Sequence, residues 1–350
     1  MTSKPHKPVE FNFSKLPLLA LEQIIDGMHL TEIVNLSLCS KRSKKTVATA
    51  RTIPKTHMDI DIDRNHFRIC VYTAGNKETV SVWTMVDKNA DQGDNREFSV
   101  DGIEGLIRTN PSSTDTYCEA FNFTSTPQRI AVSMAPIISH LLQALPNCQV
   151  KFLTVDYRRL FHFNFETALA AVKSAEIVML TNQAMSFQSK YILTNIRITK
   201  VFENLSQNKS PCSSQLPHKL ECSDKIECLD ASFIRGDFLL RLNCKDVLLR
   251  NTKFSVDDVM EFLKKWKNST GDEMGRIQCI KLELTSVVLA AEHLEELGAV
   301  KWDTKKYPTY YRKNEQWINC ADGVYIQQSN GLKMVIKPFY QGLYFLVWRD

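Results

Sequence analysis

The feature that most constrains the fold of this 350-residue chain is a series of short apolar runs, several of them followed by segments with helical periodicity. A strand followed by a helix every roughly 20–30 residues is typical of a leucine-rich-repeat-like solenoid, with an ordinary α/β layer as the alternative. The runs cover 150–156, 175–182, 225–232, 246–254 and 277–286, with Phe152, Val178, Leu229, Leu249 and Leu282 as their markers. The markers recur at irregular intervals, and the longest interval has room for a second unit near 192–199.

Helices are predicted within and before this series, over 166–175, 255–268 and 135–145. In 255–268, Ser255 is a candidate N-cap, and an apolar stripe recurs at spacings of three and four residues. Its members are Val259, Phe262, Leu263 and Trp266. The helix over 135–145 places His140 on its apolar side, where a packing role is favoured over that of a catalytic base.

Strands are predicted on both sides of this series. The segment 58–72 begins with Met58, Ile60 and Ile62 alternating with aspartates, the period of a half-buried strand, and 78–86 completes a β-hairpin across a turn at 74–76. The aspartates could suggest a metal site, but a solvated strand face is favoured. At the C-terminus, 323–348 predicts a three-strand meander with Asn330-Gly331 as one turn. The polar stretch 87–116 is interpreted as a long loop.

Composition excludes several classes of protein. We expect no secretory signal and no membrane span, and we expect the ten cysteines to be reduced thiols without metal-ligand spacing. Residues 1–55 hold nine Lys/Arg and four Asp/Glu, which accounts for the whole net charge of +5 and disfavours a nucleic-acid-binding main fold. No nucleotide-binding, metalloprotease or serine-hydrolase motif occurs, so no catalytic residue, metal or cofactor is predicted.

The N-terminal block, residues 11–47, is unusually rich in aliphatic side chains. Pro17 suits a first helical turn, Gly27 marks a helix end, and further helices are predicted from Thr31 and from about Ser40, the last one with a basic cluster. Three such short helices cannot bury all their aliphatic residues among themselves. Either the rest of the chain or a partner protein must cover part of this surface.

This block resembles an F-box over about residues 12–53. The resemblance rests on Leu16-Pro17, Ile24-Ile25, Met28, Ile33, Leu36 and Cys39-Ser40-Lys41. It implies binding to the Skp-type adaptor of cullin–RING ubiquitin ligases, with contact and core positions that sequence alone does not separate. These positions are Leu16, Pro17, Ile24, Ile25, Met28, Ile33 and Leu36. Leu19, Leu30 and Ser43 depart from the usual Glu, Pro and Trp.

The region 57–350 resembles an F-box-associated type 2 domain. The resemblance rests on the order Asn-Cys, strand, cap and helix within 226–268 and on the final segment 329–348. The predicted fold is α+β: a short disordered N-terminus (1–11), a three-helix F-box, an irregular leucine-rich-repeat-like α/β domain and a C-terminal β-meander. The resemblance implies a non-catalytic substrate receptor of a Skp–cullin–F-box ligase in the cytoplasm or nucleus. Its target and the residues that bind the target cannot be derived from the sequence.

The alternative is an interaction scaffold outside any ligase, in which the N-terminal helices merely cap the fold. The two functions differ in where Leu16-Pro17 and Ile24-Ile25 lie. Burial of these residues inside the chain would favour the scaffold, whereas exposure would favour the receptor.

Overall fold

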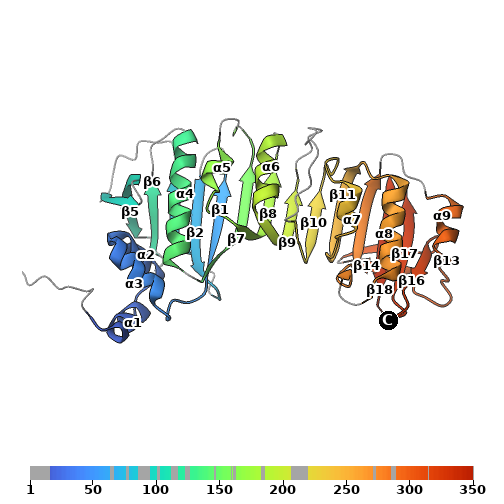
Figure 1. The fold of residues 1–350 in the computed structure, drawn as a ribbon, viewed down its shortest axis with the longest axis horizontal. Helices are drawn as coiled ribbons and strands as arrows, with labels where there is room; N and C mark the ends of the chain where they lie inside the picture. The colour runs from blue at the N-terminus through green and yellow to red at the C-terminus, as the bar shows by residue number, and fades with distance from the viewer. Residues whose placement is uncertain are drawn as a thin grey trace, which may run out of the picture. The chain divides into compact units, whose positions relative to one another are not determined.

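The computed structural model describes residues 16–349 except for short segments, and the chain divides into two compact units. Unit 1 comprises Met1–Ile60, Asn65–Val150 and Thr167–Val172, and unit 2 comprises Asp61–Arg64, Lys151–Glu166 and Lys173–Asp350. Each unit is described by itself (Figure 1). The segments outside the description are 64–66, 76–78, 86–94, 101–102, 112–116, 123–126, 146, 159, 161–162, 183–185, 206–219, 271–272, 285–288 and 314; for 79–130, 133 and 186–189 the backbone alone is described.

Unit 1 begins with three short helices: α1 (Leu18–Asp26), α2 (Leu30–Cys39) and α3 (Lys41–Thr49). The Glu32 carboxylate accepts a 2.8 Å hydrogen bond from the His29 backbone N–H at the start of α2. Ser40 caps α3, because its Oγ accepts from the Ser43 backbone N–H at 3.0 Å. The three predicted helices are therefore confirmed, and α3 starts at its expected position. The interpretation of Thr31 as the cap of the second helix was wrong, because His29 is the N-cap of α2 and Thr31 lies within it. The predicted disordered tail, 1–11, lies outside the described residues.

The rest of unit 1 contains strands and one long helix. These elements are β1 (Thr56–Ile62, of which the last two residues belong to unit 2), β2 (Phe67–Thr73), β3 (Thr79–Met85), β4 (Asn95–Val100), β5 (Ile103–Pro111), β6 (Tyr117–Asn122) and α4 (Pro127–Ala144). The first strand of the predicted hairpin, 58–72, is divided into β1 and β2, and only β2 pairs with β3 in an antiparallel hairpin. Strands β4–β5–β6 form a separate antiparallel sheet. In β1, Met58, Ile60 and Ile62 are buried and alternate with half-buried aspartates, as predicted.

The prediction of a long loop over 87–116 was wrong in its central part, because β4 and β5 occupy 95–100 and 103–111. The high polarity of this stretch outweighed two strand signals in the interpretation. Phe98, Val100, Ile103 and Ile107 are strand-forming residues, and the dipeptide between the two strands is Asp-Gly, a common hairpin connection. Residues 87–94 and 112–116 lie outside the described part of the chain.

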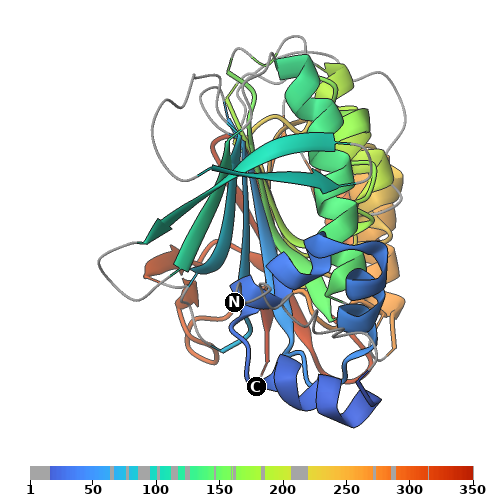
Figure 2. The same ribbon diagram turned by 90° about the vertical axis from the view of Figure 1, so that its left-hand side faces the viewer.

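The helices α2 and α3 pack on each other and on α4. Ile33, Val34 and Val47 are buried in this packing. A buried hydrogen bond joins Ser37 Oγ to His140 Nε2 at 2.9 Å, which confirms a packing role for His140. The N-terminal helices therefore belong to the same compact unit as α4 (Figure 2).

Unit 2 begins with parallel strands in sequence order. These are β7 (Cys148–Asp156, of which the first three residues belong to unit 1), β8 (Ser174–Thr181), β9 (Arg197–Asn204), β10 (Lys225–Cys228), β11 (Asp246–Thr252) and β12 (Cys279–Leu284). Each pairs in parallel with the next. The intervening helices are α5 (Phe165–Ala168), α6 (Ser186–Asn195), α7 (Gly236–Leu239) and α8 (Val256–Asn268). The yellow-green α6 and the orange α8 lie on one face of the sheet in Figure 2.

The apolar runs therefore form strands as predicted, and the helix over 255–268 is confirmed with its cap and its buried stripe. The helix predicted over 166–175 ends already at Ala168 and is only four residues long. The chain continues in a turn over 169–171, and Ser174 and Ala175 pair with β9. The leucine-rich-repeat-like character of this region stays a prediction.

The C-terminal part continues the same sheet with antiparallel strands. Strand β12 is followed in space by β18 (Gly342–Trp348), β17 (Lys333–Phe339), β16 (Val324–Gln327) and β13 (Val300–Lys301). Gly331, with φ of +91°, lies in the predicted turn before β17. The remaining elements are α9 (Ala291–Glu296) and a separate hairpin of β14 (Tyr310–Lys313) and β15 (Gln316–Asn319). The predicted α+β class and the C-terminal meander are confirmed.

Among the helices that the structure describes, none has the length and apolar character needed to cross a bilayer.

Candidate functional site

The helix α1 exposes large apolar side chains to solvent. Leu18, Leu19 and Ile24 have relative exposures of 57%, 75% and 40%, while Leu21 and Ile25 are buried. Eight large hydrophobic side chains are exposed in the part of the chain with described side chains, and three of them are on this nine-residue helix. A helix that is apolar on both its buried and its exposed sides is typical of a surface that a partner covers.

The seven residues predicted for adaptor contact or core divide into two groups. Ile25 and Ile33 are core residues, with exposures of 1% and 2%. Pro17 and Ile24 are exposed, whereas Leu16, Met28 and Leu36 are half-buried. The structure thus divides the seven residues by burial, and their role in adaptor contact stays a prediction. The exposure of α1 also singles out Leu18 and Leu19, which the predicted set did not include.

The three departures from the F-box pattern have local structural roles. Leu30 is buried at the start of α2, and Ser43 takes part in the cap of α3, where its Oγ lies 2.8 Å from Ser40 Oγ. Leu19 is the most exposed of the three. It therefore adds apolar surface where a carboxylate is usual, and it leaves the helix core unchanged.

A second candidate site is a groove of about 490 Å³ on unit 2. Its floor is formed by β10 and β11, and one wall is formed by residues of the β14–β15 hairpin. The polar residues that line it are Lys225, Glu227, Asp246, Lys313, Glu315 and Gln316. Leu248 adds an apolar side chain to the floor.

Ion pairs connect the charged side chains on the floor of this groove. Lys225 Nζ lies 2.7 Å from Glu203 Oε1 and 2.8 Å from Glu227 Oε2, so two carboxylates share one ammonium group. Lys313 Nζ lies 3.1 Å from Asp246 Oδ1 and ties the hairpin to β11. Sequence reasoning missed this site because its residues come from segments far apart in the chain. The available signal was the charge at alternate positions of β10, which places Lys225 and Glu227 on the face opposite the buried side chains of this strand.

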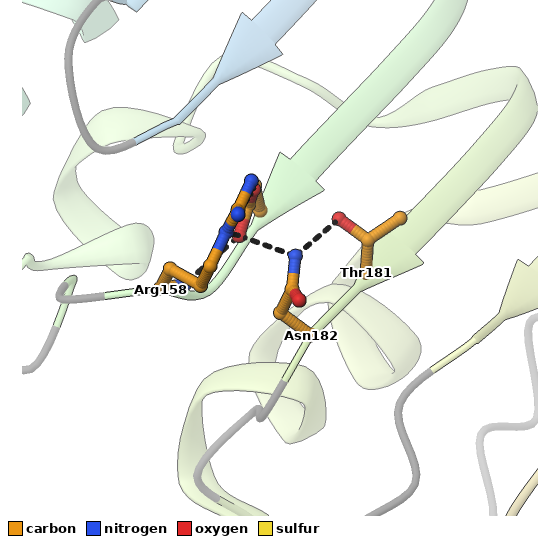
Figure 3. Close-up of polar contacts among 4 residues, drawn as sticks. Arg158, Thr181 and Asn182 are labelled. Atoms are coloured by element: carbon orange, nitrogen blue, oxygen red, sulfur yellow. Dashed lines mark hydrogen bonds and ion pairs between the residues drawn. The ribbon is translucent and has the colours of Figure 1, made fainter.

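A polar cluster lies at the carboxyl ends of β7 and β8 in unit 2 (Figure 3). Asp156 Oδ1 accepts from the Arg158 backbone N–H at 3.0 Å and from Asn182 Nδ2 at 2.8 Å, and its Oδ2 accepts from Arg158 Nε at 2.9 Å. Asn182 has a φ of 61°. Asparagine tolerates this left-handed conformation better than most residues do. Both carboxylate oxygens of Asp156 are thus engaged, and the cluster is a structural connection between strands.

We expect Asp156→Asn to lower the free energy of unfolding by about 2 kcal/mol at pH 7. Burial alone would raise the pKa of Asp156, but the hydrogen bonds from Arg158 and Asn182 outweigh it and hold the pKa below its ordinary value. A depressed pKa stabilises the fold above the unfolded-state pKa of about 3.9, and that stability is lost as the pH falls through the folded-state pKa.

Urea unfolding at several pH values measures this effect. The gap between wild type and Asp156→Asn should shrink as the pH falls below about 3.9. The control is Asp237→Asn, which breaks an exposed pair with Arg241 at 3.5 Å. This change should alter stability by less than about 0.5 kcal/mol at any pH. A gap for Asp156→Asn that stays constant down to low pH would contradict the assignment of the ionised carboxylate to the cluster.

Thiols with little contact with solvent in the described chain, the half-buried Cys148 and the buried Cys244, are poor nucleophiles. Burial raises the pKa of Cys148 to about 11 and that of Cys244 to about 12. Both groups are therefore protonated at neutral pH. Among the described residues, no group of three or more His, Cys, Asp or Glu side chains is arranged to hold a metal ion.

Comparison with known proteins gives matches in both units. Residues 13–52 match the F-box domain, and residues 214–279 match the family described as F-box associated. Two Caenorhabditis elegans proteins are similar along most of their length: the uncharacterized protein F59B2.9 (22% identity over 97% of this chain and 79% of the relative) and the uncharacterized protein F59B2.8 (23% identity over 97% and 78%). No solved structure matches the chain.

Proposed function

We propose that this chain is a substrate-recognition subunit of a Skp–cullin–F-box ubiquitin ligase. It carries an F-box domain at residues 13–52 and an F-box-associated type 2 domain at 214–279. The observation that carries this proposal is the exposure of Leu18, Leu19 and Ile24 on α1. Solvent exposure of three large aliphatic side chains on one short helix is unfavourable for a free chain. Burial against a helical Skp-type adaptor would relieve it.

In this proposal, the predicted F-box residues have two roles. Pro17 and Ile24 contact the adaptor directly, together with Leu18 and Leu19, and the half-buried Leu16, Met28 and Leu36 form the border of the contact. Ile25 and Ile33 hold α1 and α2 in the unit and do not reach the partner. The packing of α2 and α3 on α4 supports a fixed orientation of this surface within unit 1.

Unit 2 is proposed to bind the target protein through the leucine-rich-repeat-like α/β region and the C-terminal meander. The chain then acts without chemistry of its own, in the cytoplasm or nucleus. By holding the target near the ubiquitin carrier of the ligase, it raises the effective concentration of the target's lysines.

Reconstituted ubiquitin transfer tests this function directly. Purified chain, Skp-type adaptor, cullin–RING core and ubiquitin-charging enzymes are combined, and modification of the chain's own lysines is followed on gels. We expect modification that requires the adaptor and is lost when Leu18 and Ile24 are both changed to Asp. Equal modification with and without adaptor would contradict the ligase assignment and favour the interaction scaffold.

A further inference from the structure

We propose that the groove between the β10–β11 floor and the β14–β15 hairpin of unit 2 binds a lysine or arginine side chain of the target protein. This inference rests on the proposed receptor function and assigns the part of the target that is recognised. The groove has a volume of about 490 Å³. Binding sites usually measure from roughly 300 to roughly 1000 Å³, so this groove has room for one long side chain and its flanking backbone.

The position of the groove leaves it available to a partner. The opposite face of these strands buries Ile226, Cys228, Val247 and Leu249. The groove-side residues of the same strands are only half-buried; they are Lys225, Glu227, Asp246 and Leu248. The hairpin is held at one side of this surface by the Lys313–Asp246 pair and by a 3.1 Å hydrogen bond from the Tyr311 hydroxyl to the Gln278 carbonyl. A preformed wall of this kind reduces the ordering cost of binding.

The charges of the groove favour a cationic occupant. Four carboxylates, those of Glu203, Glu227, Asp246 and Glu315, lie in or beside it, against two ammonium groups, those of Lys225 and Lys313. Lys225 is already shared by two carboxylates, and Lys313 is paired with Asp246. Glu315 is exposed on the hairpin and has no ion pair with any described residue. An anionic ligand would therefore meet cations that are already neutralised, whereas a cationic side chain would meet surplus carboxylate oxygens.

The apolar part of the groove fits the same type of side chain. Leu248 offers a surface for the methylene groups of lysine or arginine while the charged end reaches Glu227 or Glu315. A guanidinium group adds the possibility of two parallel hydrogen bonds to one carboxylate. A purely apolar target residue would leave these carboxylates desolvated without a partner, which is costly.

A positional-scanning library of short peptides tests the proposal on the full chain. Each sublibrary fixes one amino acid at one position, and binding is read by fluorescence polarisation. We expect sublibraries with fixed arginine or lysine to be enriched and the binding to weaken as salt rises from about 50 to about 300 mM. For a single peptide made from the enriched residues, Glu227→Gln and Glu315→Gln are each expected to weaken binding about tenfold. The control Glu292→Gln, on the exposed start of α9, is expected to leave the affinity unchanged.

Three outcomes overturn the inference: no enriched sublibrary, enrichment of acidic or purely apolar residues, or basic enrichment that Glu227→Gln and Glu315→Gln leave intact. Calorimetry of the same preparations with the Skp-type adaptor separates this result from the proposed function. If the chain binds the adaptor but no lysine or arginine sublibrary is enriched, only the assignment of the groove is contradicted. If lysine or arginine sublibraries are enriched but the chain does not bind the adaptor, the ligase role is contradicted. The groove then remains as a site that binds basic segments of other proteins.

Discussion

Gly342→Ala is expected to lower the free energy of unfolding by about 4 kcal/mol or more. Gly342 begins β18 and pairs with Glu283 of β12 on one side and Phe339 of β17 on the other. A Cβ atom at this position would lie 1.8 Å from the backbone oxygen of Leu282. The obstacle is main chain in the interior of the sheet, so no side-chain rotation can relieve the overlap.

Urea unfolding followed by tryptophan fluorescence measures this effect, since Trp266, Trp302 and Trp348 all lie in unit 2. Gly27→Ala provides the control, because Gly27 has φ of −82° and its added Cβ would meet the Ile24 oxygen at an ordinary 3.6 Å. We expect this change to alter stability by no more than about 1 kcal/mol. A loss below about 1 kcal/mol for Gly342→Ala would mean that β12 and β18 do not pair in the register described.

The second large effect is expected from a contrast between adjacent residues of α1. Ile25 has an exposure of only 1%, whereas Ile24 has an exposure of 40%. Ile25→Asp places a carboxylate in the core and is expected to destabilise unit 1 by about 4 kcal/mol. Ile24→Asp is expected to cost less than about 1 kcal/mol because its carboxylate stays in water.

Hydrogen exchange of the α1 and α2 amides, together with thermal unfolding, distinguishes the two variants. Loss of protection in Ile25→Asp with wild-type protection in Ile24→Asp is the expected pattern. Equal destabilisation would show that α1 packs in a different rotation about its axis. A double change at both residues would confuse loss of folding with loss of binding, so the binding test must leave Ile25 intact.

Much of the fold could be predicted because its signals are local. The period of two in β1, the cap and apolar stripe of α8, and the Asn330-Gly331 turn each lie within a few neighbouring residues. The spacing of apolar side chains along one short segment is sufficient there, because it decides which face of the strand or helix is buried. The F-box helices were predictable for the same reason.

The remaining features depend on contacts that no short segment contains. Ile24 and Ile25 are both isoleucines, and only the packing of α1 decides that one is exposed and the other buried. The groove brings together residues 225–248 and 313–316, which meet only after β10, β11 and the hairpin have assembled. In 95–111 the polar residues outweighed the strand-forming residues in the interpretation, because the pairing of β4 with β5 is a contact between two segments that neither segment shows by itself.

The account's central claim is that the exposed side of α1 binds a Skp-type adaptor, and titration calorimetry of the full chain against that adaptor tests it most directly. We expect wild type to bind with a dissociation constant of about 1 µM or tighter, and Leu18→Asp/Ile24→Asp to bind at least ~100-fold more weakly while its thermal unfolding is unchanged. Val132→Asp, at a comparably exposed aliphatic residue of α4 (58%), is the matched control and should bind like wild type. Wild-type binding that the double variant retains, or no binding by the wild type at all, would contradict the claim.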